Sequence, residues 1–212
     1  MTLIDKQAPP GTTLTNDTIQ QTLYAGLARK YVNQRILVLI PDHTRTLPLP
    51  FLFRALIDVL NDVKQLDFMV ALGSHHPLDD DQILELYGIS PERKAEEFAD
   101  SSFLNHRWDL PGTLTKIGSI SEEVIEEITG GLFRESVDVD INRDIFDYDL
   151  LVILGPVFPH EVVGISGGSK YLFPGISGGD FLHFFHWLGA VISCWKIIGN
   201  KNTPVREVVN AA

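Results

Sequence analysis

The stretch RILVLIPDHTR, residues 35–45, decides the fold. Its residues 36–40 form an unbroken apolar run that stops at Pro41 and Asp42. A run of this length and composition is typical of a strand that is buried on both faces, as in a parallel sheet. The sequence therefore predicts a central strand, followed directly by a polar loop.

Two further apolar runs have the same form. LDFMVAL, residues 66–72, precedes GSHHP, and DLLVIL, residues 149–154, precedes GPVFPH. Between the runs, residues 50–63 carry apolar side chains at helical spacing, and residues 79–87 open with an acidic cluster that suits the start of a helix. This alternation predicts an α/β fold: a Rossmann-like sheet of mainly parallel strands, flanked by helices, in a single domain.

The rest of the chain divides into less regular segments. Residues 1–17 are polar and rich in Thr and Pro, which predicts an N-terminal arm, and residues 18–200 form the α/β domain. Residues 103–143 are expected to hold short strands and a helix near residues 121–129. Residues 201–212 are expected to be a tail or the start of a linker.

The longest apolar run, residues 181–198, is interrupted by His183, His186 and Lys196. A transmembrane helix needs ~20 mostly apolar residues, so a buried helix is the better interpretation. No membrane partner is expected. The N-terminus lacks the basic and apolar regions of a secretory signal, and a cytoplasmic location is expected.

The charge balance restricts the classes of partner. The 17 Lys and Arg residues stand against 28 Asp and Glu residues, which gives a net charge of −11 and no basic run. Nucleic acid is therefore not an expected partner, although one arginine or lysine could still bind a small anion. The single cysteine, Cys194, excludes an intramolecular disulfide and a cysteine-rich zinc site.

Three predicted strands end in loops whose side chains can do chemistry. In open α/β sheets, ligands bind outside the carboxyl ends of the strands, so these loops would meet at one edge of the sheet. Taken singly, each loop could hold only a local salt bridge or a solvated histidine. Their joint occurrence favours a site, and the residues concerned are Asp42, His43, Thr44, Arg45, Ser74, His75, His76 and His160.

Residues 155–179 contain seven of the chain's 17 glycines, together with Lys170. Glycine lets the backbone approach a ligand closely, and free N–H groups at Gly167 and Gly168 could cradle a phosphate. The segment is not a Walker A motif, because the upstream Gly164 is too close. Lys170 could be a counter-charge, a desolvated and nucleophilic amine, or a surface lysine in a flexible loop.

His183 and His186 lie three residues apart in an aromatic stretch. On a helix they would share a face and could present two imidazoles to one ion, such as nickel, copper or zinc. The chain has no HExxH motif and no cysteine ligands to add, which argues against a closed zinc site. A metal that a cofactor brings in would need only one imidazole.

Together these motifs resemble the N-terminal domain of the nickel-pincer lactate racemase family. The block from His160 to Ile176 is highly specific for the family, whereas DHTR alone is not. A histidine sixteen residues beyond the lysine, His186, completes the pattern. The matching segments are DHTR (42–45), ALGSHHP (71–77), PHEVVGISGGSK (159–170) and LFPGISG (172–178).

The resemblance implies a nickel-pincer nucleotide, which is a nicotinate-derived pyridinium mononucleotide with two sulfur groups that hold nickel. It implies covalent attachment at Lys170 through a thioamide, and His186 as the remaining metal ligand, with His183 as the competing candidate. The other expected cofactor contacts are Asp42, which could instead orient Arg45, and the glycines Gly167 and Gly168.

The resemblance also implies the activity, which is racemisation or epimerisation of a 2-hydroxy acid. His75 and His160 would flank the substrate as alternate general bases, with His76 as the alternative to His75, and Arg45 would bind the substrate carboxylate or a cofactor anion. One base takes the hydroxyl proton while hydride moves to the pyridinium C4, and hydride then returns to the opposite face of the 2-oxo acid. The expected partners are the 2-hydroxy acid and the cofactor-biosynthesis enzymes.

Members of this family carry a second, C-terminal domain that closes over the site, and 212 residues leave no room for it. The chain is therefore expected to be a racemase, the cofactor-bearing half of one, or a domain that binds cofactor or hydroxy acid without turnover. A generic metal-dependent hydrolase fits less well, because a carboxylate-rich ligand set is missing. An apolar surface near residues 181–195 could be the interface of a homo-oligomer or the contact surface of a missing C-terminal domain.

Overall fold

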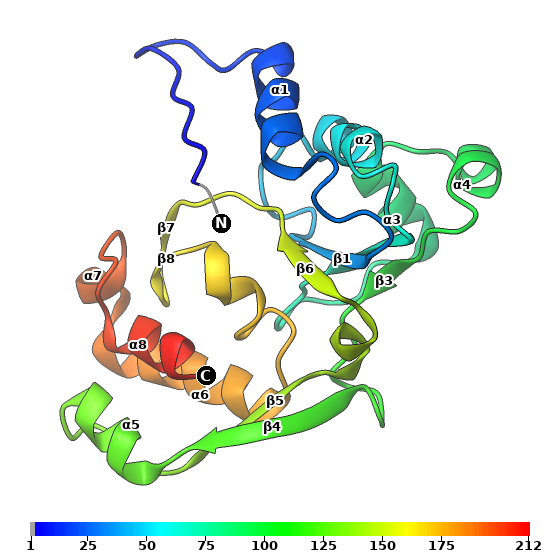
Figure 1. The fold of residues 1–212 in the computed structure, drawn as a ribbon. Coiled ribbons are helices and arrows are strands. Elements are labelled where there is room, and N and C mark those ends of the chain that lie inside the picture. Colours follow the sequence, from blue (N-terminus) through cyan, green and yellow to red (C-terminus); the bar gives the residue numbers. More distant parts are fainter. Residues whose placement is uncertain (1–2) are drawn as a thin grey trace.

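The computed structural model describes residues 3–212, and Figure 1 shows their arrangement. A four-stranded parallel sheet has the order β3-β2-β1-β6, and β1 pairs in continuous register with both of its neighbours. The expected α/β fold with a parallel sheet is confirmed. The strands are β1 (Arg35–Ile40), β2 (Gln65–Val70), β3 (Phe103–Asn105) and β6 (Leu150–Ile153).

Helices cover both faces of this sheet (Figure 1). The first three contribute to the hydrophobic core on one face, the fourth has no buried residue, and the last four contribute to the core on the other. They are α1 (Asn16–Leu27), α2 (Leu49–Val59), α3 (Asp80–Tyr87), α4 (Pro91–Glu97), α5 (Glu122–Thr129), α6 (Gly179–Ile192), α7 (Cys194–Ile197) and α8 (Pro204–Ala211).

β1 is central because its side chains alternate between these two cores. The even-numbered residues of the run 36–40 pack with α2 and α3, and the odd-numbered ones pack with α6 and α8. All five have no solvent exposure. A strand that is buried on both faces needs apolar residues at every position, which explains why the run shows no alternation with polar residues.

Local sequence determines where α3 and α5 begin and end. Asp79 caps α3, since its carboxylate accepts from the backbone N–H of Gln82 while the Gln82 side chain accepts from the N–H of Asp79. The side chain of Ser121 caps α5 in the same position. Gly88 and Gly130 end the two helices in the left-handed conformation that glycine adopts without strain.

A second layer lies beside the parallel sheet. β4 (Leu114–Ile120) and β5 (Val137–Asn142) pair antiparallel, and β5 contacts α6. A short hairpin, β7 (Pro159–His160) with β8 (Gly164–Ile165), follows β6, and two single turns are η1 (Arg143–Asp147) and η2 (Gly168–Tyr171). The expected short strands and helix within residues 103–143 are confirmed.

The structure differs from expectation at the long apolar run. Two helices form there instead of one, because Ser193 has a φ of 81° and interrupts the helical backbone between α6 and α7. Only one face of this segment is buried, and Trp195 is 90% exposed. Within residues 3–212, no helix combines the length and the apolar character that crossing a membrane requires.

The two chain ends also carry more structure than a tail and an arm suggest. Residues 201–212 include α8, whose Val205, Val208 and Val209 are buried in the core. Whether a linker follows stays a prediction. At the other end, α1 begins at Asn16, within the expected arm of residues 1–17, and the first two residues of that arm lie outside the described residues.

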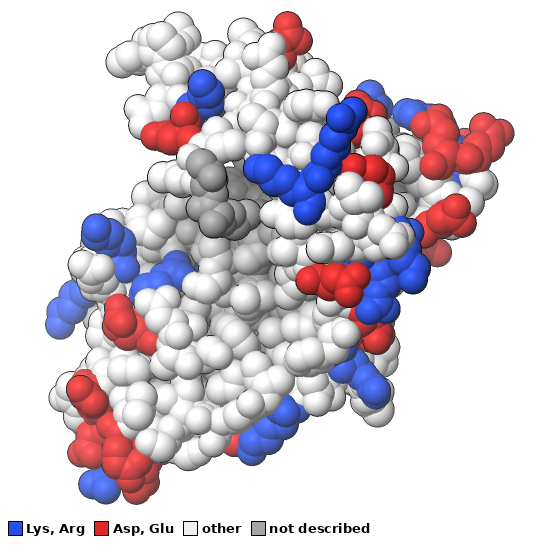
Figure 2. Space-filling view, viewed as in Figure 1, with Lys and Arg blue, Asp and Glu red and all other residues white. Residues whose placement is uncertain are grey.

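Charged side chains are unevenly distributed over the surface. On the face that Figure 2 shows, acidic side chains gather over α4 and α5, and the basic ones form no continuous area. This agrees with the net charge of −11.

Candidate active site

The strand order reverses at β1, which has β2 on one side and β6 on the other. In open α/β sheets such a reversal opens a crevice at the carboxyl ends of the strands. A cavity of about 110 Å³ lies at this position, lined by residues from the loops after β1, β2 and β6. The predicted loops therefore do meet at one edge. Pockets for drug-sized ligands hold ~300–1,000 Å³, so the described walls enclose space for a small ligand or for one part of a larger one.

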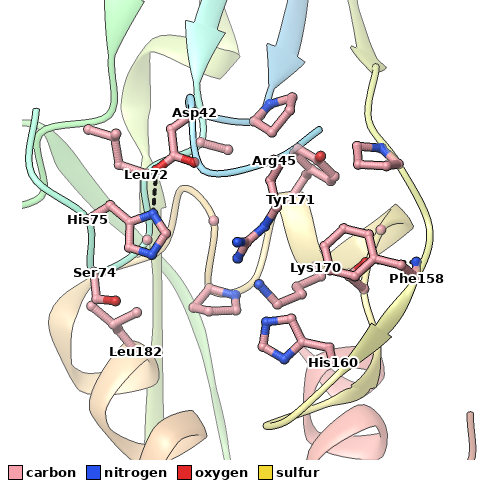
Figure 3. A pocket seen from close by; sticks show the side chains of 18 of the residues that line it. Asp42, Arg45, Leu72, Ser74, His75, Phe158, His160, Lys170, Tyr171 and Leu182 are labelled. Atoms are coloured by element: carbon pink, nitrogen blue, oxygen red, sulfur yellow. Dashed lines mark hydrogen bonds and ion pairs between the residues drawn. The ribbon is translucent and has the colours of Figure 1, made fainter. Parts of the chain in front are cut away.

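His75 and Asp42 form a hydrogen-bonded pair on one side of this cavity (Figure 3). The two residues follow β2 and β1, which are neighbours in the sheet. Asp42 is 4% exposed, and an ionised carboxylate only accepts hydrogen bonds, so Nδ1 of His75 is the donor. Nε2 of His75 therefore keeps its lone pair and can accept a proton.

Asp42 is ionised despite its burial. Burial by itself would raise the pKa of its carboxyl, but hydrogen bonds from Thr44 and His75 outweigh that effect and leave the pKa below its ordinary value. Oδ1 of Asp42 accepts from both the backbone N–H and the hydroxyl of Thr44, at 3.1 and 2.6 Å. Arg45 meets the same hydroxyl, since its Nη1 donates to Thr44 Oγ1 at 3.1 Å. Asp42 thus reaches Arg45 through Thr44.

The guanidinium of Arg45 lies over the ring of Phe158, 5.6 Å from its centroid, and points toward the middle of the cavity (Figure 3). Among the ion pairs between residues 3 and 212, none involves Arg45. Its charge is therefore available to an anionic ligand, and guanidinium can bind a carboxylate through two parallel hydrogen bonds.

His160 lies on the side of the cavity away from His75 (Figure 3) and is 4% exposed. Its Nδ1 accepts from the backbone N–H of Val162 at 3.1 Å, and the Glu161 carboxylate is 3.6 Å from the same nitrogen. Burial, and next the charge of Lys170, hold the pKa of His160 well below its ordinary value, while Glu161 opposes this shift. The ring is therefore neutral at pH 7 in this chain.

Lys170 extends into the cavity from η2, between His75 and His160 (Figure 3). Burial, followed by the nearby charge of Arg45, lowers the pKa of Lys170 to about 8. Its ammonium nitrogen lies 6.0 Å from the ring centroid of Phe185. At neutral pH a measurable fraction of this amine is uncharged, and an uncharged amine is a nucleophile.

The two histidines of α6 face different surroundings. His186 lines the cavity, and its Nδ1 donates to the carbonyl oxygen of Leu182 at 2.7 Å, which leaves the Nε2 lone pair free. Burial lowers the pKa of His186. His183 lies instead against Trp108, with ring centroids 6.0 Å apart, and lines a separate groove. The expected shared face thus splits into two environments, and His186 is the one beside Lys170.

Of the remaining expected site residues, some line the cavity and others do not. Gly167 lines the cavity with a φ of 87°, and a Cβ there would be 2.7 Å from the Val157 side chain, so the loop requires glycine. Gly168 has a φ of 58° and faces open space. His43 and His76 are exposed, and neither is among the residues that line the cavity.

Sequence reasoning gave no role to two titratable side chains that line the cavity, Tyr171 and Glu161. Tyr171 packs its hydroxyl against the backbone of Gly155, where any Cβ would overlap it, and burial raises the pKa of Tyr171 to about 12. Glu161 faces the cavity next to His160. Tyr171 follows Lys170 in the sequence and Glu161 follows His160. This adjacency to predicted site residues is the signal that could have found them.

Comparison with known proteins identifies a matching family and two related proteins. Residues 12–196 match the profile of the lactate racemase N-terminal domain family. The chain is 29% identical over 146 residues to a lactate racemase from Lactiplantibacillus plantarum, which covers 67% of this chain and 30% of that protein. It is 24% identical over 184 residues to a lactate racemase from Thermoanaerobacterium thermosaccharolyticum, which covers 84% of this chain and 39% of that protein.

Solved structures show the same fold. A crystal structure of a Thermotoga maritima protein superposes with a TM-score of 0.83 at 26% identity, over 93% of this chain and 47% of that one. The lactate racemase apoprotein from Thermoanaerobacterium thermosaccharolyticum gives 0.65 at 18% identity, over 91% and 45%. The chain spans less than half the length of each of these relatives. The profile match covers most of its residues, and the chain belongs to the lactate racemase N-terminal domain family.

Proposed function

We propose that this chain is a 2-hydroxy-acid racemase or epimerase, lactate-like in its substrate, or the cofactor-bearing part of one. A nickel-pincer nucleotide attached at Lys170 would serve as its cofactor. One observation carries the proposal: two imidazoles, of His75 and His160, lie on opposite sides of one cavity with a desolvated lysine between them (Figure 3). The lactate racemases among its relatives support the same class of reaction.

The side chains of the cavity fit such a cofactor. Within the part of the chain that the structure describes, no group of three or more His, Cys, Asp or Glu side chains is placed to hold a metal ion. A metal that arrives on the sulfur atoms of a cofactor needs only one protein ligand. His186 offers that ligand at Nε2, because its Nδ1 is held by the Leu182 carbonyl. The lowered pKa of Lys170 suits covalent attachment through its nitrogen.

When bound, the nucleotide supplies a pyridinium carbon that accepts hydride and returns it. The protein's part is to move protons and to hold the acid. His75 accepts the hydroxyl proton of one isomer at Nε2, while Asp42 holds its ring and stabilises the imidazolium that results. On the opposite face His160 would exchange the proton; because its Nδ1 accepts from the Val162 N–H, the neutral ring carries its hydrogen at Nε2 and takes up a second proton only when that bond to Nδ1 is released. Glu161, 3.6 Å from His160 Nδ1, favours the protonated ring that one direction of the reaction requires.

Arg45 would bind the substrate carboxylate, because its guanidinium is free of carboxylate partners and points into the cavity (Figure 3). This placement would hold the hydroxyl-bearing carbon between the two imidazoles. Asp42 orients His75 and, through Thr44, Arg45, so one buried carboxylate supports both the base and the carboxylate site.

The experiment co-expresses the chain with the cofactor-building enzymes and incubates it separately with each enantiomer of lactate. Chiral chromatography follows the opposite isomer. We expect conversion from both sides, and His75→Ala and His160→Ala should each lose ~10²-fold or more, as removal of a general base does. His76→Ala, a matched exposed histidine, should leave the rate unchanged. Nickel-loaded protein that converts neither isomer would exclude a racemase that is active alone and leave the cofactor-bearing part, and protein that acquires no nickel would contradict both.

A further inference from the structure

The C-terminal helix α8 packs against the glycine-rich loop that carries Lys170. Arg206 of α8 makes two contacts with this loop. Its Nη2 donates to the carbonyl oxygen of Ile165, and its Nη1 donates to Ser169 Oγ at 3.4 Å. The two acceptors lie on either side of residues 166–168, and Ser169 immediately precedes Lys170.

Other contacts hold the start of the same loop. Thr203, which is 3% exposed, donates from Oγ1 to the carbonyl of Val163 at 3.1 Å and accepts from the backbone N–H of Arg206. The N–H of Gly199 donates to the carbonyl of Gly164 at 2.9 Å. The loop is therefore bonded to the C-terminal segment at several successive positions, and Arg206 supplies the contact nearest to Lys170.

The guanidinium of Arg206 forms hydrogen bonds but pairs with no carboxylate among the described residues. No ion pair between described residues involves it, and burial lowers the pKa of its guanidinium. Desolvating a charge is costly unless it forms good hydrogen bonds, and an apolar residue would pack on the helix at lower cost. Its hydrogen bonds go to the loop, and a planar guanidinium can join two acceptors where a lysine reaches only one point.

We propose that Arg206 is a positioning residue, which bridges Ile165 and Ser169 and thereby fixes the direction in which Lys170 enters the cavity. The role of Lys170 rests on the proposed function, but the bridge itself does not. Both tests below therefore use the chain without cofactor, so their outcome is independent of whether a cofactor adduct forms.

The first test measures amide hydrogen exchange in peptides that cover residues 163–173. In this segment Ser166 N–H donates to Phe158 O at 2.8 Å, and Phe173 N–H donates to Ser169 O at 2.9 Å. We expect Arg206→Ala to speed exchange there at least tenfold, while β1 stays protected. The matched control is Arg143→Ala, which removes an arginine bond to a backbone carbonyl, that of Gly112, in another loop. Unchanged exchange in Arg206→Ala, or equal acceleration in the control, would overturn the proposal.

The second test follows the amine of Lys170 itself, by acetic anhydride labelling at a series of pH values with peptide mass spectrometry. The wild-type midpoint should lie near pH 8, given the lowered pKa of Lys170. In Arg206→Ala the midpoint should rise by about one pH unit or more, because the amine gains solvent and loses a neighbouring positive charge. Arg206→Lys keeps a positive charge without the bridge, and it separates the two causes.

We expect Arg206→Lys to exchange amides of residues 163–173 nearly as fast as Arg206→Ala. This conservative variant also keeps the test valid if the alanine variant folds poorly. Wild-type exchange in Arg206→Lys would show that charge alone suffices and would overturn the bridging role. A labelling midpoint for Lys170 that stays at the wild-type value in either Arg206→Ala or Arg206→Lys would overturn the positioning role.

Discussion

The buried carboxylate of Asp42 accepts a hydrogen bond from Nδ1 of His75, although the two residues are 33 positions apart in the sequence. The pairing follows from the parallel sheet, since β1 and β2 are neighbours and their carboxyl ends place both loops at one edge. It determines which nitrogen of His75 faces a ligand as a base. A histidine held in this way by a carboxylate keeps one tautomer and is stabilised when it takes up a proton.

Asp42→Asn should therefore lower the racemisation rate of cofactor-loaded protein by ~10²-fold or more, because the neutral amide stabilises neither the tautomer nor the imidazolium of His75. Nickel content should stay at the wild-type level, since Asp42 contacts Thr44 and His75. The rate and the nickel content are measured on the same preparation. A rate within threefold of wild type would remove Asp42 from the account.

His106 provides a pH-dependent contribution to stability away from the cavity. It is 1% exposed, its Nε2 donates to the Ser177 carbonyl, and its Nδ1 accepts from the Asn142 amide. Burial lowers the pKa of His106 to about 4 from an ordinary 6.5. Between these values the unfolded chain binds the proton and the folded one does not, so stability falls as the pH drops from 6.5 to 4.

The shift corresponds to a loss of about 3 kcal/mol over this range for His106 alone. Urea unfolding at successive pH values measures it, and His106→Gln should show a flatter dependence even though it starts from lower stability. Parallel pH curves for the wild type and His106→Gln would mean that this imidazole is not held neutral.

Gly164 tests how tightly the loop lies against the C-terminal segment. It has a φ of 93°, and a Cβ there would overlap the carbonyl oxygen of Asn200. Gly164→Ala should lower the free energy of unfolding by about 2–3 kcal/mol through strain and overpacking. Gly168→Ala is the matched control, because it has a positive φ but open space around it and should cost about 1 kcal/mol. Equal losses in denaturant unfolding would contradict the close approach.

The two histidines of α6 should differ in their effect on metal retention. His186→Ala removes the imidazole that lines the cavity and should lower the nickel content of cofactor-loaded protein, as measured by elemental analysis after dialysis. His183→Ala, on the same helix but against Trp108, should leave nickel content unchanged. If the His183 variant loses nickel and the His186 variant keeps it, the ligand assignment is reversed.

The sequence allowed prediction of the strands and of the loops that meet at their ends, because a doubly buried strand shows as an unbroken apolar run such as residues 36–40. Parallel strands then place Asp42, His75 and His160 at one edge without further information. Which of these side chains bond to one another depends on loop backbone that composition does not determine. The Asp42–His75 pair was therefore not anticipated.

The packing of α8 was missed for a related reason. Residues 201–212 are short and polar enough to suggest a tail, and their three buried valines become visible as a face only once a helix is assumed. The contact between Arg206 and Ile165 joins positions 41 apart and uses a backbone carbonyl, which has no sequence signature. His186 and His183 could be separated only by knowing the rotation of α6 about its axis.

Attachment of the cofactor at Lys170 is the central claim, and intact-mass analysis tests it most directly. The chain is co-expressed with the cofactor-building enzymes and measured beside Lys170→Arg, which keeps the positive charge but lacks the amine. We expect a covalent mass increase and bound nickel in the wild type, with peptide mapping to Lys170, and neither in Lys170→Arg. A wild-type chain that leaves these conditions unmodified and free of nickel would contradict the account.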